Sequence, residues 1–275
     1  MSAPAGHQGE VNLATELEQQ GVAGRIITPV GDVYRKARRL VQGDPRTTMG
    51  LAHLLPATLT EVVDGVSKLS GSDLPAEGDG DGDGKCWVDA SVLVGLADAA
   101  RERLIAACDR GETVLFGTGH PAGPIDLYVR LAAAMAGAGA RVQRFAEAEY
   151  FDLDVYHGRG QIRYVGEVAC LSAGGELLHT HSPRPMEYLL DVGHTPDLVV
   201  GDHGFAGAGL ARGADAVALV DTNDPALVLA WMRGLPIHPM VCDDNRPPSC
   251  YHALADHLTS RHRLKSLWRV SSTDG

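Results

Sequence analysis

Short apolar segments alternate with helical segments through residues 111–275. Two of the apolar segments, LVVG at 198–201 and AVALV at 216–220, contain no polar residue. Such segments are typical of strands that are buried on both faces of a sheet. Buried strands that alternate with helices predict an α/β fold with a mainly parallel sheet covered by helices. We therefore expect a Rossmann-like α/β domain over residues 111–275.

Residues 1–110 have a different pattern, which predicts a helical N-terminal region. The segments LATELEQQ, DVYRKARRLVQGD and LTEVVDGVSKLSG are expected to be helices, as is a longer run over about 89–109. In that run, apolar residues recur every three or four positions and predict one buried face, formed by Val92, Leu96, Ala99, Ala100, Leu104 and Ala107. We expect the N-terminal helices to form part of the pocket wall.

An acidic segment, EGDGDGDGK at 77–85, interrupts this helical region. Its aspartates match the start of a calcium-binding EF-hand loop, but Ala90 stands where such a loop has a bidentate glutamate. Its glycines also disfavour the entering helix that an EF-hand needs. A solvated acidic loop is therefore favoured, with a calcium site as the alternative.

The overall charge argues against two classes of partner. The chain has 24 basic and 35 acidic residues, which gives a net charge of −11. This balance disfavours nucleic acid and anionic membrane surfaces as partners. Five scattered cysteines without a CxxC pair favour free thiols in a reducing compartment. The N-terminus has no signal-peptide pattern and no apolar run is long enough to span a membrane, so a cytoplasmic location is expected.

Polar side chains follow nearly every predicted strand of the second half. Because ligands in α/β proteins bind beyond the carboxyl ends of parallel strands, these side chains are expected to meet at one site. A sheet with no such site would need only turn residues at these positions. The candidates are Gly117, Thr118, Gly119, His120, His179, His181, Asp202, His203, Asp221, Asn223, Asp224, Asp243, Asp244, Asn245 and Arg246.

The segment GTGH at 117–120 follows the first of these strands and precedes a helix. It is neither a Walker A loop nor a dinucleotide fingerprint, because Ala122 stands where the third glycine of the fingerprint would be. Glycine amides beside a helix N-terminus can bind phosphate, so Gly117, Thr118 and Gly119 are candidates for a phosphate cradle. The alternative is a tight strand-to-helix turn.

The histidines and acids also have structural alternatives. His179 and His181 would share one face of an extended segment, or could be two separate polar residues at a strand end. Asp202, Asn223 and Asp224 precede predicted helices and could be N-caps, which makes Asp221 the better ligand. The segment CDDNRPP could be a polar turn, and its Arg246 could bind a phosphate or one of the neighbouring acids.

Several carboxylates that converge in a cleft usually stay ionised together only around a cation. Asp202, Asp221, Asn223, Asp224, Asp243 and Asp244 are therefore the candidate ligands of a divalent metal. Oxygen ligands favour Mg²⁺ or Mn²⁺, whereas added histidines would allow Co²⁺, Ni²⁺ or Zn²⁺. His120, His179, His181 and His203 are the candidates for protonating a leaving group or stabilising transition-state charge.

The motifs GTGHP, HTHSP, GDHGF and DTNDPAL resemble those of an actinobacterial phosphatase family, in the same order. The similarity covers roughly residues 110–258, with a weaker match in GDPRTTMGL at 43–51. It implies a Rossmann-like phosphatase, with a role in specialised metabolism. Phe205 stands where the family often has tryptophan, which is expected to alter the pocket wall. The resemblance implies no particular catalytic residue.

Phosphate-ester hydrolysis by a metal-activated water is the expected reaction, and a small phosphorylated metabolite is the expected substrate. One alternative is a phosphatase of the haloacid dehalogenase type, because Asp152, Asp154 and Val155 match its nucleophile motif. The apolar strand that should precede this motif is poor, and the chain has no lysine between Lys85 and Lys265. The other alternative is a non-enzymatic protein that binds a phosphorylated metabolite.

Overall fold

A computed structural model describes residues 12–75, 84–153 and 158–260. Apart from its last two residues, the acidic segment 77–85 lies outside these ranges, and so do Asp154 and Val155. Among the described residues, no helix is both long and apolar enough to cross a membrane.

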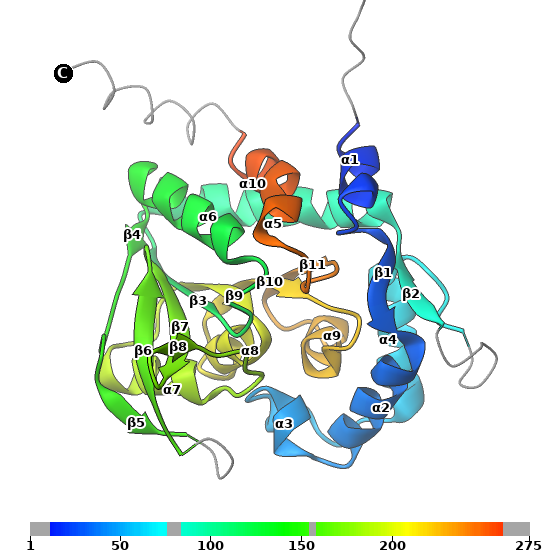
Figure 1. Ribbon diagram of the computed structural model, residues 1–275, viewed down its shortest axis with the longest axis horizontal. Helices are drawn as coiled ribbons and strands as arrows, with labels where there is room; N and C mark the ends of the chain where they lie inside the picture. The colour runs from blue at the N-terminus through cyan, green and yellow to red at the C-terminus, as the bar shows by residue number, and fades with distance from the viewer. Residues whose placement is uncertain (1–11, 76–83, 154–157, 261–275) are drawn as a thin grey trace, which may run out of the picture.

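The centre of the molecule is a mixed sheet with the strand order β11-β10-β9-β3-β7-β6-β5 (Figure 1). The pairs from β11 to β7 are parallel, and β4 also pairs with β3 in parallel. The parallel strands are β3 (Thr113–Thr118), β4 (Arg141–Val142), β7 (Val168–Ala173), β9 (Leu198–Asp202), β10 (Asp215–Val220) and β11 (Ile237–Val241). The predicted α/β fold with a mainly parallel sheet is therefore confirmed.

The other edge of the sheet is antiparallel. It contains β5 (Tyr150–Asp152), β6 (Arg159–Val165) and β8 (Glu176–Leu177). A turn at Gly174–Gly175 joins β7 to β8, and a second turn at residues 166–167 joins β6 to β7. In the segment RVQRFAEA, only the first two residues, which form β4, pair with β3.

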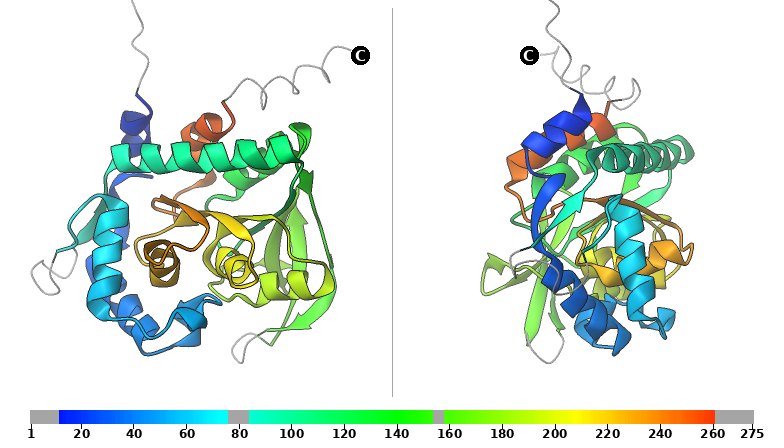
Figure 2. Two further views of the ribbon diagram at one scale, coloured as in Figure 1. Left: turned by 180° about the vertical axis from the view of Figure 1, so that it is seen from behind. Right: turned by 90° about the vertical axis from the view of Figure 1, so that its right-hand side faces the viewer.

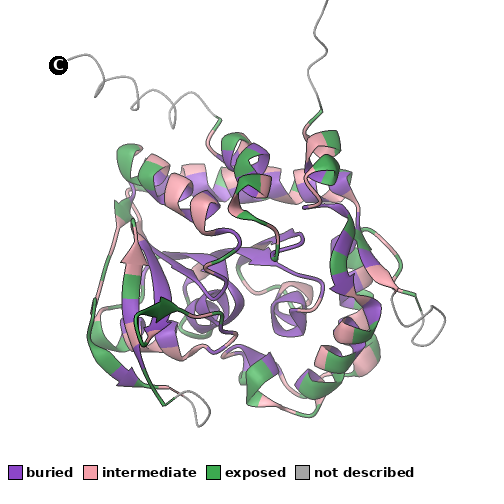
Figure 3. Cartoon of the chain, in the orientation of Figure 1, coloured by how far each residue is buried: buried purple, intermediate pink, exposed green. Residues whose placement is uncertain are grey.

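Helices cover both faces of the sheet (Figures 1 and 2). One face is covered by α5 (Ala90–Arg110), α6 (Ile125–Gly137) and α10 (His252–Leu258), with the 3₁₀ helix η2 (Pro248–Tyr251) before α10. The other face is covered by α7 (Arg184–Val192), α8 (His203–Ala211) and α9 (Pro225–Met232). The parallel strands other than β4 are consequently almost entirely buried, and exposed residues lie on the outer sides of the helices and on β5 and β8 (Figure 3).

The first 110 residues contain helices, as predicted, and also an antiparallel strand pair that was not predicted. The elements are α1 (Leu13–Gln19), β1 (Gly24–Pro29), α2 (Val30–Val41), α3 (Pro45–Thr48), η1 (Ala52–Leu54), α4 (Leu59–Ser70) and β2 (Lys85–Val88), followed by α5. Their apolar side chains share one core cluster with the sheet, which includes Leu40 and Leu219. The division at residue 110 therefore stays a prediction from sequence pattern.

Helix α5 begins and ends within one residue of the predicted range, and three of the six residues of its predicted buried face, Ala100, Leu104 and Ala107, are buried. The buried residues include Leu93 and Ala97, whereas Val92 and Leu96 are only partly buried and Ala99 is exposed. Helix α5 packs against β10, β11, α1 and α10.

Candidate active site

The candidate site lies where the carboxyl ends of β3, β9, β10 and β11 meet, which is the edge that strand pattern predicted. A cavity of about 350 Å³ opens there. It is lined by Ile27, Thr28, Pro29, Asp32, Arg35, Lys36, His120, His179, His181, His203, Asp221, Asn223, Asp244 and Asn245. Residues of β1 and α2 thus form part of the wall, which confirms that the N-terminal region contributes to the pocket.

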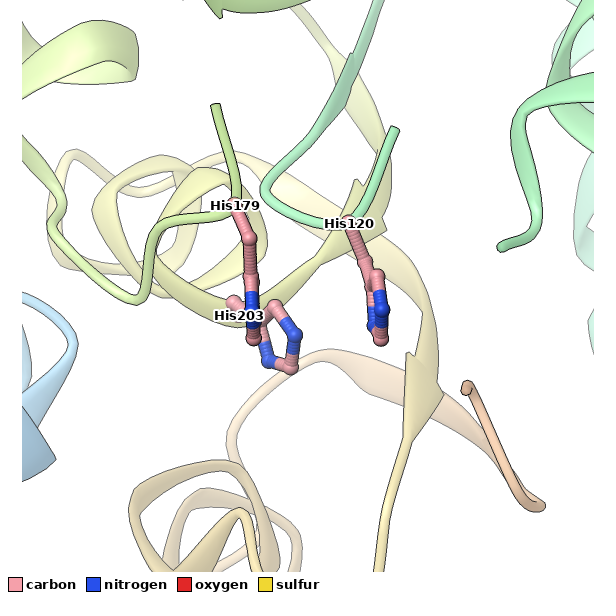
Figure 4. A group of neighbouring side chains, drawn as sticks. All are labelled: His120, His179 and His203. Atoms are coloured by element: carbon pink, nitrogen blue, oxygen red, sulfur yellow. The ribbon is translucent and has the colours of Figure 1, made fainter. Parts of the chain in front are cut away.

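Four histidines from three segments converge in this cavity. His120 follows β3, His203 begins α8, and His179 and His181 lie between β8 and α7. The rings of His120 and His179 are stacked with centroids 4.4 Å apart, and those of His181 and His203 are 3.9 Å apart. Figure 4 shows His120, His179 and His203 approaching one another from separate parts of the chain.

Two groups within this cluster have donor atoms close enough to share a metal ion. One comprises His120, His179 and His203, and the other comprises His181, His203 and Asp224. Within each group the donor atoms lie within 4.8 Å of one another. Of the six residues predicted as metal ligands, only Asp224 belongs to such a group, and the predicted catalytic histidines supply the other members.

Two carboxylates flank His203, which is almost completely buried. Its Nδ1 atom lies 3.2 Å from both oxygens of Asp224, and its Nε2 atom lies 3.2 Å from Oδ2 of Asp244. Burial lowers the pKa of His203, but the negative charges of Asp224 and Asp244 outweigh it and raise the pKa to about 10.

The other histidines titrate differently. Burial and the neighbouring His203 lower the pKa of His179 to about 4, and they hold the pKa of His181 well below its usual value. Burial tends to lower the pKa of His120, but the Asp244 carboxylate has the opposite effect, and the pKa lies above its usual value. His179 and His181 are therefore neutral at pH 7, which is the form that ligates metals.

The backbone of His203 is in the left-handed region, with φ of 44°. A residue with a Cβ atom is strained there, at a cost on the order of 1–3 kcal/mol. The residue stands at the junction where β9 ends and α8 begins, so the turn directs the imidazole into the site. Strained residues of this kind concentrate at functional sites.

The predicted phosphate cradle is instead engaged within the protein. The Gly119 amide donates to Oδ1 of Asp202 at 2.6 Å, and the Thr118 hydroxyl donates to Oδ2 at 2.6 Å. The His120 amide donates to the same hydroxyl at 2.9 Å. The amides of Gly119 and His120 are thereby used, and Gly117, Thr118 and Gly119 are not among the described residues that line the cavity. The loop serves to position His120.

Close packing explains the two glycines of this loop. A Cβ atom on Gly119 would lie 2.0 Å from the Thr180 carbonyl oxygen, and one on Gly117 would lie 2.2 Å from the Phe205 ring. Phe205 is buried against Gly117 and does not line the cavity, so its predicted effect on the pocket wall can only be indirect.

The acids that follow β10 and β11 have two roles: some line the cavity, and others hold the segments that surround it. Asp221 lines the cavity, and its carboxylate accepts hydrogen bonds from the hydroxyls of Thr28 at 2.6 Å and Thr222 at 3.0 Å. Burial and the nearby Asp244 raise the pKa of Asp221 well above its usual value. Asp243 supports the site from outside the cavity, because its oxygens accept from the amides of Ile27 and Asn245.

Neither aspartate at a predicted helix start acts as an N-cap. Asp202 and Asp224 occupy the N-cap positions of α8 and α9, but neither side chain caps its helix. Asp202 binds the 117–120 loop instead, and Asp224 faces His203 and accepts from the Asp221 amide at 3.1 Å. Asp224 therefore faces the histidine cluster, whereas Asp202 supports the loop beside it.

A cation that the strand-end pattern missed completes the cavity. Lys36 of α2 lines it and donates from Nζ to Oδ1 of Asn223 at 2.7 Å. The sequence signal was the amphipathic pattern of α2, whose polar side carries Arg35 and Lys36. Asn245 also lines the cavity, but Arg246 packs beside Gly21, away from the described lining residues.

Asp152, the only residue of the haloacid dehalogenase nucleophile motif that lies within the described ranges, is far from the candidate site in the sheet. Asp152 ends β5 at the antiparallel edge, and its side chain is 88% exposed beside Arg159. It is separate from the cavity lining. A nucleophile in that class of enzyme would be expected at the carboxyl end of a parallel strand.

Comparisons with known proteins identify the family of the chain. The model of a family described as "Phosphatase" matches residues 8–266. A protein named phosphatase SCO2771 from Streptomyces coelicolor is 30% identical over 272 residues, which cover 94% of this chain and 98% of the relative. No solved structure matches. The chain therefore belongs to this phosphatase family, as predicted, while the assignment of the four motifs to the family stays a prediction.

Proposed function

We propose that this phosphatase hydrolyses the phosphate monoester of a small metabolite, with a divalent metal and with water as the nucleophile. The observation that carries the proposal is the convergence of four histidines, Asp224 and Lys36 at the strand ends of an α/β sheet. A cavity of about 350 Å³ suits a small ligand.

The residues present fit a metal ion. His120 Nδ1, His203 Nε2 and Asp244 Oδ2 are buried atoms without a hydrogen-bond partner among the described residues. Buried polar atoms without a partner are costly, and a cation would satisfy the two nitrogens and the carboxylate oxygen. We assign metal binding to His120, His179 and His203, with Asp224 orienting His203 from behind. The ion would take the place of the proton that Asp224 and Asp244 favour on His203 when no metal is bound. When bound, the ion would polarise the phosphoryl oxygens and activate the attacking water.

The nature of the donor atoms supports a change in the expected metal. Imidazole nitrogens suit Zn²⁺, Co²⁺ and Ni²⁺ better than Mg²⁺, which prefers oxygen ligands. Because the donor groups are mostly histidine, we propose Zn²⁺, Co²⁺, Ni²⁺ or Mn²⁺ as the bound ion rather than Mg²⁺.

Side chains of α2 would bind the phosphate. Lys36 brings positive charge to a cavity in a protein whose net charge is −11, whereas Arg35, which also lines the cavity, is paired with Asp32. Lys36 is held by the neutral amide of Asn223, so this contact does not cancel the ammonium charge. An ammonium or guanidinium group forms strong charge-assisted hydrogen bonds with phosphate oxygens.

Asp221 is the carboxyl group that we assign to proton exchange with the reacting water or the leaving oxygen. It lines the cavity, and the hydroxyls of Thr28 and Thr222 fix its orientation. A buried carboxyl group with a raised pKa can carry a proton near neutral pH. All five cysteines are free, so we also propose a reducing, cytoplasmic location.

The direct test is phosphate release from a panel of monophosphates by chelator-stripped protein to which single metals are restored. We expect no turnover without metal and the fastest turnover with Zn²⁺, Co²⁺, Ni²⁺ or Mn²⁺. His179→Ala should abolish most of the activity, because it removes one of the three proposed metal ligands from the cavity wall. His53→Ala, at an exposed position in η1, is the matched control.

Two results would count against the proposal. Full turnover by stripped protein without added metal would contradict the metal-assisted mechanism. Tight binding of monophosphates without any phosphate release, under every metal, would indicate a binding protein.

A further inference from the structure

A second cavity, of about 290 Å³, adjoins the candidate active site. Lys36, His179 and His181 line both cavities, so a ligand could occupy the two together. The second cavity is lined by Lys36, Arg39, Pro45, Arg46, Thr47, His179, Thr180, His181 and Ser182. It therefore extends the reaction site along α2 toward α3, which follows α2 in the chain (Figure 1).

One side of helix α2 serves both cavities. Its buried residues include Val33, Ala37 and Leu40, which pack into the core. Lys36 and Arg39 are three residues apart and therefore neighbours on one face of the helix. Lys36 lines both cavities and Arg39 lines the second. The helix thus carries a line of positive charge away from the histidine cluster.

The second cavity is suited to an anion. Among the described residues, its walls contain three cationic side chains, those of Lys36, Arg39 and Arg46, and no carboxylate. Arg46 forms a two-point ion pair with Asp44, with distances of 3.0 and 2.6 Å, which offsets its charge, so Lys36 and Arg39 carry the net positive charge of the wall. Hydroxyl groups of Thr47, Thr180 and Ser182 add uncharged polar surface. Such a lining fits a carboxylate or phosphate group.

We propose that the preferred substrate carries a second anionic group, which binds in the cavity lined by Lys36, Arg39 and Arg46 while the scissile phosphate lies at the histidine cluster. This inference rests on the proposed phosphatase function. The substrate class is then a phosphorylated carboxylic acid or a bisphosphate. A phosphate ester of a neutral alcohol would fill only the first cavity.

The test compares substrates that differ only in the second group. Glycerol 3-phosphate and 3-phosphoglycerate share a three-carbon skeleton, and fructose 6-phosphate and fructose 1,6-bisphosphate form a second pair. We expect the wild-type protein to have a kcat/KM at least about tenfold higher for the member with the extra anion, as one charge-assisted contact provides. The pair with the larger ratio identifies carboxylate or phosphate as the second group.

Variants locate the effect in the cavity. Arg39→Gln should lower the ratio of kcat/KM values about tenfold, mainly by raising KM for the ester with the second anion. Arg39→Lys keeps the positive charge and should retain most of the wild-type ratio. Raising the salt concentration should also lower the wild-type ratio, because ions screen exposed charges. Arg38→Gln removes the same charge from the same helix, at an exposed position outside the cavity lining, and should leave the ratio unchanged.

The outcomes separate the two proposals. Hydrolysis of all four esters with a ratio near one, or a folded Arg39→Gln variant with the wild-type ratio, would overturn the second-anion inference and leave the phosphatase function intact. Absence of turnover with every metal and every ester would instead count against the proposed function.

Discussion

The Nδ1 atom of His203 lies 3.2 Å from both carboxylate oxygens of Asp224. The contact fixes the orientation of a ring whose Nε2 atom lies near Asp244 on the opposite side. A carboxylate behind a histidine ligand is a common arrangement in metal sites, where it sets the tautomer and raises the basicity of the ligand. The acid that sequence pattern could assign only as a ligand or an N-cap is therefore best explained as the support of a ligand.

Replacing Asp224 with asparagine should weaken metal binding about 10–100-fold, as loss of an orienting partner does at other metal sites. Asparagine retains the shape of the side chain but removes the charge that faces His203. Metal affinity can be measured by competition with a chromophoric chelator. The control is Asp256→Asn, which removes an exposed acid paired with Arg130. Wild-type affinity in a folded Asp224→Asn protein would exclude the orienting role.

Replacing Asp202 with asparagine tests whether this acid holds the 117–120 loop. Both of its oxygens accept hydrogen bonds, from Thr118 and Gly119, and the residue is completely buried. An amide group can accept only one of them, so the free energy of unfolding should fall by about 1–3 kcal/mol. Denaturant unfolding measures the loss. Metal content should be retained, whereas a protein of normal stability that no longer binds metal would make Asp202 a ligand.

The strand pattern located the site but could not assign the roles of its residues. Residues that follow parallel strands meet at one edge because of sheet geometry, which is why His120, His203, Asp221 and Asp244 were predicted together. Whether a carboxylate faces the cavity or the protein depends on side-chain rotamers and on partners such as Thr28, which is about 190 residues from Asp221. No local pattern contains that information.

The contribution of α2 was also beyond the sequence pattern. Lys36 and Arg39 have the spacing of any solvated helix face. Only the packing of α2 beside α9 shows that this face borders the cavity. The buried face of α5 was likewise predicted only in part. Its second half is buried as expected, whereas Leu93 and Ala97 are more deeply buried than Val92, Leu96 and Ala99.

Gly119→Ala should strongly destabilise the protein, in contrast to the same substitution at a glycine with open space around it. The added Cβ atom would lie 2.0 Å from the Thr180 carbonyl oxygen, and backbone cannot give way as a flexible side chain does. Because the 117–120 loop positions His120, activity should be lost together with stability. Gly95→Ala is the control, since Gly95 lies in α5 with open space around it. It should raise the free energy of unfolding by roughly 0.5–1 kcal/mol, as replacement of a helical glycine does. Equal stability of the two variants would contradict this account.

Thr28→Val tests the link between the N-terminal strand β1 and the proposed chemistry. The Thr28 hydroxyl donates to Oδ2 of Asp221 at 2.6 Å, and valine has nearly the same shape without the donor. An unpartnered carboxylate oxygen costs about 1–3 kcal/mol. The negative form of Asp221 loses more than the protonated form, so the pKa of Asp221 should rise.

We therefore expect kcat to fall about tenfold in Thr28→Val, as for loss of one positioning contact, with KM little changed. The limb of the pH–rate profile that reports Asp221 should move to higher pH. Thr28→Ser retains the donor and should keep the wild-type profile. A merely structural role for Thr28 would lower stability in the valine variant but leave the pH profile of the folded enzyme in place. That result would remove Asp221 from proton transfer.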